Sequence, residues 1–342
     1  MTAGGNGAPE GEPSPRVPAR PPEVTDRPPE DVAERLASLS TSLDESGLPP
    51  KVLDRNLLVA TWNLRAFGAV TKAWHSGKDD SPKRDLQDIL CIREIVSRFD
   101  VVALQEVRGN LQGLRYLIKA LGPDWGLILT DVTKGRAGND ERMAFLFDTR
   151  RVRPSGLACE LVVSVEENTQ KAGRETLDRQ FARTPYAVSF ISSGQTFILV
   201  TLHVIFGESG KDRLGELTEI AEWLAEWAKE VDDYNQNLIA LGDFNIDRAG
   251  DPTYEAFTAT GLHPPEELQT IPRTIFTKAG EDANQFFDQI AWFPEQLSLQ
   301  YTGEAGNFDF VPVLQTSLTK NELSWRISDH YPLWANFSSA HG

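Results

Sequence analysis

The chain has 342 residues, a hydrophobic content of 40% and a formal net charge of −16. No apolar run approaches the ~20 residues needed to cross a bilayer, so a membrane-spanning helix is excluded and a globular protein with a substantial core is expected. The acidic balance argues against a protein that grips nucleic acid through a broad basic surface, although a bound cation and a few arginines can still attract phosphate locally.

The first 50 residues hold ten of the 21 prolines, with four basic and nine acidic side chains. This composition predicts a disordered acidic tail over residues 1–50. The first ten residues have neither the basic nor the apolar region of a secretory signal, so we expect a cytoplasmic protein. Apolar residues within the tail recur at helical spacing and predict a short amphipathic helix, which either docks on the body or a partner or forms only transiently: Val32, Leu36, Leu39 and Leu43.

Three later segments have the apolar periodicity of helices: Asp85 to Phe99, Leu111 to Leu121 and Lys211 to Lys229. Cys91 lies in the first of them among aliphatic residues, and we interpret it as a small buried hydrophobe. Cys159 is the only other cysteine in the sequence, which excludes a disulfide framework and a cysteine-based zinc cluster.

Short apolar runs rich in β-branched and aromatic residues predict ten strands. Because many strands occur with few helices between them, we expect two sheets packed face to face and covered by helices, rather than a doubly wound parallel sheet. The predicted strands span residues 57–62, 101–105, 126–130, 143–147, 157–165, 186–191, 196–203, 238–243, 286–292 and 331–337.

Polar side chains stand where several of these strands end or begin. Desolvated charges without partners cost several kcal/mol, so these groups are expected to converge on one site around a cation. The oxygen donors among them are of the hard type that selects Mg²⁺ or Mn²⁺, with Ca²⁺ as a further candidate, over Zn²⁺. The donors are Asn63, Glu106, Asp243, Asn245 and Asp329.

Two histidines, His203 and His330, add imidazoles suited to proton transfer beside such a cation, which is typical of phosphoester hydrolysis. Two isolated carboxylates, Glu141 and Asp288, are candidates to fix the imidazole tautomers. Two arginines can clamp phosphate through bidentate contacts: Arg108 and Arg183.

These residues belong to eight short motifs, which are, in chain order, Trp62-Asn63, Gln105-Glu106-Val107-Arg108, Glu141-Arg142, Arg183-Thr184-Pro185, Thr201-Leu202-His203, Gly242-Asp243-Phe244-Asn245, Asp288-Gln289-Ile290 and Ser328-Asp329-His330-Tyr331-Pro332. In this order, the motifs resemble those of the endonuclease/exonuclease/phosphatase superfamily, and within it most closely the deoxyribonuclease I branch. The resemblance covers roughly residues 56–337. It implies a catalytic domain over residues 51–338, built as a four-layered α/β sandwich of two packed, mainly antiparallel sheets flanked by helices.

The same resemblance implies residue roles in a divalent-metal-dependent nuclease that acts on DNA. Asn63 and Glu106 would hold the metal, with Asp329 close by. Asp243 and Asn245 would position the attacking water and the phosphate. His203, paired with Glu141, and His330, paired with Asp288, would act on the nucleophile, the phosphate or the leaving oxygen. Arg108 and Arg183 would contact the nucleic-acid backbone or groove.

The sequence departs from this branch at positions where its members use tyrosines to grip the substrate, because Asn139 and Met143 stand there. An alternative is therefore a phosphoesterase for a small-molecule or lipid phosphate ester, and a third is a non-catalytic member of the fold. Abasic-site endonucleases usually carry Lys where this chain has Arg108, and inositol-phosphate phosphatases carry Cys-Asp-Arg where it has Phe287-Asp288-Gln289. We infer no membrane and no protein partner beyond the tail helix as a docking element.

Overall fold

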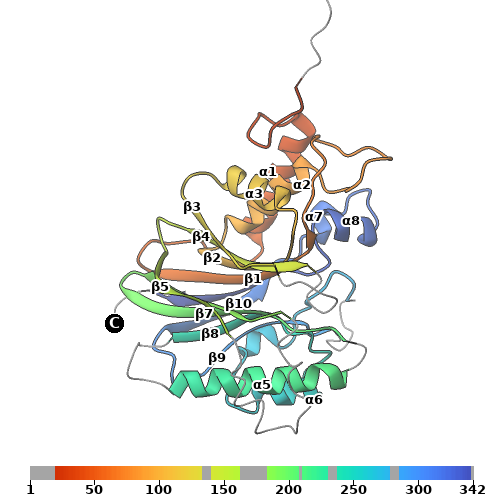
Figure 1. Ribbon diagram of the computed structural model, residues 1–342. Coiled ribbons are helices and arrows are strands. Elements are labelled where there is room, and N and C mark those ends of the chain that lie inside the picture. Colours follow the sequence, from red (N-terminus) through yellow and green to blue (C-terminus); the bar gives the residue numbers. More distant parts are fainter. Residues whose placement is uncertain are drawn as a thin grey trace, which may run out of the picture.

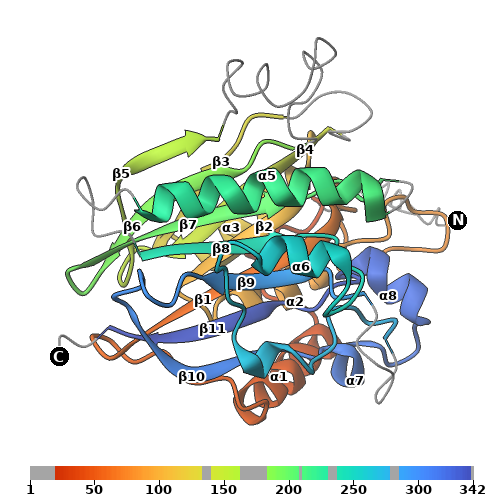
Figure 2. The same ribbon diagram turned by 90° about the horizontal axis from the view of Figure 1, so that it is seen from below.

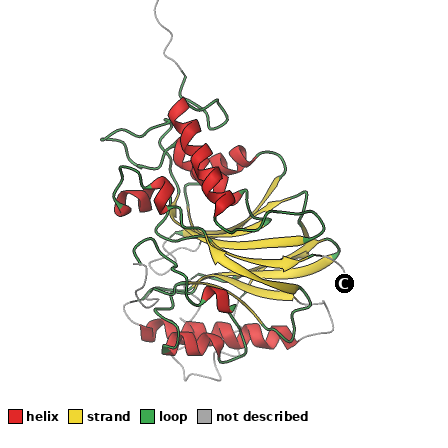
Figure 3. Ribbon diagram, turned by 180° about the vertical axis from the view of Figure 1, so that it is seen from behind, coloured by secondary structure: helices red, strands yellow, loops and turns green. Residues whose placement is uncertain are grey.

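The computed structural model describes residues 20–132, 140–161, 183–207, 210–229, 237–277 and 285–339. Two β-sheets lie face to face at the centre, and helices cover their outer faces (Figure 1). The view from behind shows the same four layers, with strands enclosed between two groups of helices (Figure 3). The predicted α/β sandwich is therefore confirmed.

Among the described residues, the first sheet has six strands in the order β10-β11-β1-β2-β4-β3. The neighbours β1 and β2 are parallel and the other pairs are antiparallel. Helices α1 (Glu30–Glu45), α2 (Leu86–Val96) and α3 (Gln112–Leu121) cover its outer face, and the short α7 (Val311–Leu314) and α8 (Lys320–Arg326) lie beside them. The strands are β1 (Asn56–Phe67), β2 (Val101–Arg108), β3 (Trp125–Leu129), β4 (Glu141–Asp148), β10 (Gln300–Asn307) and β11 (Leu333–Ser338).

In the described part of the chain, the second sheet has five strands in the order β5-β6-β7-β8-β9, with β7 and β8 parallel and the other pairs antiparallel. Helices α5 (Gly210–Lys229) and α6 (Pro252–Thr258) lie across its outer face (Figure 2). The strands are β5 (Arg153–Glu160), β6 (Tyr186–Ser192), β7 (Gln195–His203), β8 (Asn237–Asp243) and β9 (Asp288–Trp292).

Strands in the middle of each sheet are buried on both faces, which explains their unbroken apolar runs. In β1, Leu57 and Val59 pack into the core between the sheets, whereas Leu58, Ala60 and Trp62 pack under the helices. Gln105 also crosses the inter-sheet space, because its Nε2 donates to the Thr201 hydroxyl on β7 at 3.0 Å. Apolar packing and this polar tie hold the sheets in register.

The predicted helices and strands agree with the structure to within a few residues, with three differences. Strand β5 begins at Arg153, earlier than predicted, and the part of that prediction beyond residue 161 lies outside the described residues. Strand β10 was not predicted, because its sequence is mostly small and polar and it is half-exposed at the sheet edge. The short helices α6 to α8 were also not predicted.

The prediction of a disordered tail up to residue 50 is wrong for the part that begins at Arg20, because helix α1 docks on the body. Val32, Leu39 and Leu43 are buried in the core beneath it, so docking on the body is, of the alternatives that the amphipathic pattern left open, the one that the structure shows. Residues 1–19 lie outside the described part of the chain.

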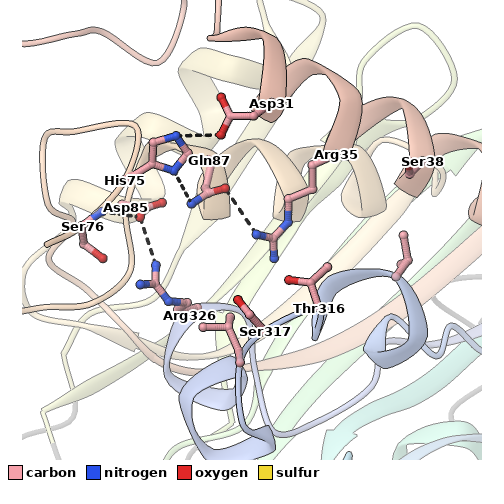
Figure 4. Close-up of a pocket in the computed structure, with 12 residues that line it drawn as sticks. Asp31, Arg35, Ser38, His75, Ser76, Asp85, Gln87, Thr316, Ser317 and Arg326 are labelled. Atoms are coloured by element: carbon pink, nitrogen blue, oxygen red, sulfur yellow. Dashed lines mark hydrogen bonds and ion pairs between the residues drawn. The ribbon is translucent and has the colours of Figure 1, made fainter. Parts of the chain in front are cut away.

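Polar contacts also hold α1, around a cavity of about 450 Å³ between α1, α2 and α8 (Figure 4). His75 Nε2 lies 3.0 Å from Asp31 on α1, and its Nδ1 is 3.0 Å from Gln87 Nε2 on α2. Arg35 Nη2 donates to the Leu314 carbonyl at 2.8 Å. Among the described residues, no helix combines the length and apolar character needed to cross a membrane.

Candidate active site

The polar residues predicted at strand ends meet at one end of the sandwich, where parallel strands of both sheets finish. In the second sheet, His203 and Asp243 are register partners at the ends of β7 and β8, and Asp288, at the start of β9, pairs with Asp243. In the first sheet, Asn63 lies on β1 beside β2, which carries Glu106. The sequence pattern therefore reflects strands that deliver their side chains to a common edge.

Two backbone irregularities aim the carboxylates into this edge. Glu106 has a φ of 59° and lies where the β2–β4 register shifts between Leu104 and Val107, and such a bulge redirects a side chain. Gly242, before Asp243, has a φ of 146°, and a Cβ there would lie 2.1 Å from the Leu202 carbonyl oxygen. Only glycine fits this close approach of β7 and β8.

An amide links the acidic groups of the two sheets. Asn63 Nδ2 donates to Glu106 Oε1 at 3.2 Å and to Asp243 Oδ2 at 3.0 Å. Its Oδ1 is buried and has no hydrogen-bond partner among the described residues. A buried amide oxygen that lacks a partner, together with adjacent carboxylates, can supply the oxygen ligands that a hard divalent cation prefers. Asn63 and Glu106 therefore fit the metal that was expected there.

A second group of potential ligand atoms adjoins the first. Atoms of Asp243, Asp288 and His330 lie within 4.8 Å of one another. Because Asp243 contacts both Asn63 and this group, the described residues can hold divalent metal around this carboxylate.

His330 is buried and held from behind by Asp288, since its Nδ1 lies 2.6 Å from Asp288 Oδ2. Its Nε2 therefore faces the site, 4.0 Å from Asp243 Oδ2. Burial opposes the charged imidazole, but the carboxylates of Asp288, Asp243 and Asp329 together outweigh it, with Asp288 contributing most, and raise the pKa of His330 well above the ordinary value.

His203, at the end of β7, repeats this arrangement. Its Nδ1 lies 3.1 Å from Glu141 Oε2, and its Nε2 is 3.7 Å from the same Asp243 oxygen that His330 faces. Burial acts to raise the pKa of Glu141, but the contacts with His203, Arg183 and Arg108 prevail and lower it, so this side chain is a carboxylate. Both histidines thus present Nε2 to one centre.

The two predicted phosphate clamps share the Glu141 carboxylate. Arg108 Nη1 lies 3.3 Å from Glu141 and its Nη2 lies 3.5 Å from Glu106, with the side chain partly exposed. Arg183 Nε lies 2.7 Å from Glu141 Oε2, and its side chain is only 10% exposed. Arg108 is therefore open to a substrate, whereas Arg183 mainly supports Glu141.

The remaining predicted residues lie around this centre. Asn245 donates its backbone N–H to Asp243 Oδ1 at 3.0 Å, and its amide donates to the Val204 carbonyl at 2.7 Å. Asp329 lies beside Arg65, whose Nη1 is 3.1 Å from Asp329 Oδ2.

Two arginines in this region were not among the predicted site residues. Arg65 contacts Asp329, as described above. Arg84 is fully buried and donates to the carbonyls of residues 65, 66, 326 and 327, which joins β1 to α8 beneath the acidic centre. Burial lowers the pKa of Arg84 to about 10 despite the nearby carboxylates. Arg84 lies in a loop, and a single arginine there forms no sequence pattern that would reveal this structural role.

Comparison with known proteins connects this geometry to a family. A sequence model of the "Endonuclease/Exonuclease/phosphatase family" matches residues 60–330. A "Deoxyribonuclease" of Thioalkalivibrio sp. is 28% identical over 85% of this chain and 73% of its own length. "Deoxyribonuclease-1" of Bos taurus is 25% identical over 82% of this chain and 92% of its own.

Solved structures share the fold at lower identity. An endonuclease/exonuclease/phosphatase family protein from Bacteroides thetaiotaomicron matches with a TM-score of 0.54 and 19% identity, covering 83% of this chain and 95% of that one. A mannosyl-6-phosphatase from the same organism matches with a TM-score of 0.53 and 19% identity, over 82% and 99% of the two chains. These similarities agree with the sandwich described above.

Proposed function

The chain belongs to the endonuclease/exonuclease/phosphatase family and is a phosphoester hydrolase, and from that premise we propose that it is a divalent-metal-dependent nuclease that hydrolyses phosphodiester bonds in DNA. The observation that carries the proposal is the convergence of two carboxylate-backed imidazoles and the Asn63 amide on Asp243. The similarity to deoxyribonucleases over more than four-fifths of the chain supports DNA as the substrate.

Mg²⁺ or Mn²⁺ is the proposed ion, with Ca²⁺ as a further candidate, because the orphaned oxygen of Asn63 and the Glu106 carboxylate are hard ligands. Such an ion, when bound, would neutralise phosphoryl oxygens and lower the pKa of a bound water. Arg108 would add a guanidinium for the same phosphate.

The positions of the protein side chains suggest a separate catalytic role for each. Asp243 would orient the attacking water and receive its proton, since Asn63 and the Asn245 backbone N–H fix both of its oxygens. His330 would donate a hydrogen bond from Nε2 to a phosphoryl oxygen, and His203 would transfer a proton from Nε2 to the leaving oxygen, so both rings would act with hydrogen on both nitrogens. Asp288 and Glu141 would accept from the Nδ1 atoms, which orients the rings and stabilises this form.

The test is incubation of the full chain with plasmid and oligonucleotide DNA in Mg²⁺ or Mn²⁺, and then with EDTA. Metal-dependent cleavage is expected, with losses of at least ~10²-fold in His203→Ala and His330→Ala. His263→Ala is a control, because His263 is paired with Trp292 through its backbone and is absent from the described site. If DNA survives while a small phosphodiester is hydrolysed, the proposal is wrong.

A second candidate is a phosphoesterase for a small-molecule or lipid phosphate ester. Met143 occupies a position where deoxyribonuclease I-like enzymes use a tyrosine against DNA, and it is only 4% exposed, so it offers no surface for a sugar or base. Residue 139, the other such position, lies outside the described part of the chain. Hydrolysis of phosphate monoesters without DNA cleavage would favour this candidate.

A further inference from the structure

Exposed aromatic rings border the candidate site. In the described part of the chain, the exposed large aromatic side chains are Phe206, Phe276 and Trp325, with 60%, 44% and 48% exposure. Phe206 follows His203 by three residues, and Phe276 lies two residues after Thr274, which pairs with His330. Single exposed rings are ordinary on protein surfaces, but all three here belong to segments that adjoin one site.

Phe206 has two side-chain contacts although most of its ring faces solvent. The ring centre lies 6.3 Å from that of Phe287 in an edge contact, and the Phe287 ring centre lies 5.9 Å from that of the His330 imidazole. The Arg213 guanidinium is 5.2 Å from the Phe206 ring centre and itself forms an ion pair with Asp247 at 2.7 Å. A row of ring contacts therefore runs outward from the buried His330 to the exposed Phe206.

Trp325, on α8, is fixed in a similar way on the half of the site that belongs to the first sheet. The Arg65 guanidinium lies 4.1 Å from the indole ring and donates to the Ser324 hydroxyl at 2.6 Å. The same guanidinium contacts Asp329. One immobilised ring thus adjoins the side of the site near β1, and Phe206 adjoins the side near β7 and β9.

We propose that Phe206 and Trp325 stack unpaired bases flanking the scissile phosphate, so that the preferred substrate is single-stranded DNA; this inference rests on the proposed nuclease function. Bases in a duplex present their faces to each other, and only an unstacked base can lie against a protein ring. Stacking also does not require positive charge, which suits a chain with a net charge of −16. Met143 is buried, so the aromatic side chains exposed near the site among the described residues are Phe206 and Trp325, each held by an arginine, and Phe276.

The test compares kcat/KM of the full chain on three substrates of one sequence: a single strand, its duplex, and a single strand with abasic analogues on both sides of the cleaved phosphate. The wild type should prefer the intact single strand over both others by roughly 5- to 100-fold for each stacked base, and so by at least ~25-fold for the two. Phe206→Ala and Trp325→Ala should each lose about half of the discrimination against the abasic strand, on a logarithmic scale. Phe206→Trp should restore it.

Leu53→Ala is the matched control, because Leu53 is also an exposed large hydrophobic residue, at 62%, but lies before β1 and away from the site. Thermal unfolding of each variant checks that folding is unchanged. Equal cleavage of intact and abasic strands, or a preference for duplex, would overturn this inference and leave the nuclease proposal standing. Absence of cleavage on all three DNAs would instead overturn the nuclease proposal.

Discussion

The Oδ2 atom of Asp243 is the point on which the candidate site converges. It accepts from Asn63 Nδ2 and faces the Nε2 atoms of both histidines, at 3.7 and 4.0 Å. Each histidine has a carboxylate behind its other ring nitrogen. The surrounding residues therefore maintain the orientation of the two imidazoles.

This arrangement predicts that His330 and Asp288 act as one unit. Asp288→Asn should lower kcat by ~10² to 10⁴-fold, close to the loss in His330→Ala, because the amide no longer fixes the ring and its tautomer. The double variant should be little worse than either single variant, as expected for residues with a shared role. Losses that multiply in the double variant would show that the two residues act independently.

A buried ion-pair cluster away from the site predicts a pH dependence of stability. Burial alone would raise the pKa of Asp148, but hydrogen bonds from Arg150 and Lys51 outweigh it and hold the pKa well below the ordinary value. Its stabilisation is thus present above the unfolded pKa of ~3.9 and is lost as pH falls toward the folded value. Asp148→Asn should lower the free energy of unfolding by ~1–3 kcal/mol at pH 7.

Denaturant unfolding at pH 7 and at successively lower pH measures this difference. It should shrink steadily below pH ~4 as the wild-type carboxylate becomes protonated. Asp124→Asn is a suitable control, because Asp124 contacts Arg150 at 3.5 Å with both side chains exposed and should contribute little at any pH. A difference between wild type and Asp148→Asn that is constant with pH would contradict the assignment.

Much of the site could be predicted from sequence because strand ends are recognisable. The predicted residues Asn63, Glu106, His203 and Asp243 are brought together, and their catalytic roles stay predictions. Arg65, Arg84 and Phe206 were missed for a physical reason. Their importance comes from contacts made across the fold, with Asp329, with four backbone carbonyls and with Phe287, which no local pattern encodes.

At the scale of single elements, the close approach of β7 and β8 requires a glycine at position 242. Gly242→Ala would place a methyl group within 2.1 Å of the Leu202 carbonyl oxygen, at a φ that side chains rarely adopt. We expect loss of more than ~2 kcal/mol in stability and displacement of Asp243, with activity falling together with stability. Gly250→Ala, at a φ of 79° but with open space around it, isolates the cost of the backbone angle.

Helix α1 provides a second test at this scale. Leu39 is fully buried beneath it, so Leu39→Ala should cost ~2–5 kcal/mol in the free energy of unfolding, measured by denaturant titration. Leu36→Ala, one turn earlier and only partly buried, should cost clearly less. If both variants lose equally little free energy of unfolding, α1 does not dock on the body of the protein.

The elements found from sequence are those with strong apolar periodicity, and those missed lack it. The interior strands β1, β2, β7 and β8 appear as uninterrupted apolar runs, whereas β10 is half-exposed and rich in polar and small residues. The prediction of disorder from composition was wrong for α1, because it rested on the prolines around the helix. The helix is instead stabilised by packing of its buried face, which consists of Val32, Leu39 and Leu43.

At the scale of the whole molecule, metal binding should couple to folding because the ligands come from both sheets. Saturating Mg²⁺ or Mn²⁺ should raise Tm relative to EDTA at equal ionic strength, by the equivalent of ~2.7 kcal/mol at a hundred times Kd. Asn63→Ala should abolish most of this shift. Asn321→Ala, on the exposed side of α8, should retain it. An unchanged shift in Asn63→Ala would place the ion elsewhere.

The site is assembled across the seam between two sheets, with Asn63 and Glu106 on one side and Asp243, His203 and Asp288 on the other. A slide of one sheet over the other by a fraction of an ångström would misalign these groups while leaving both sheets intact. On heating, enzymatic inactivation should therefore run ahead of the melting of secondary structure. The hydrogen bond from Gln105 to Thr201, which joins the two sheets, would oppose this slide and so delay the loss of turnover.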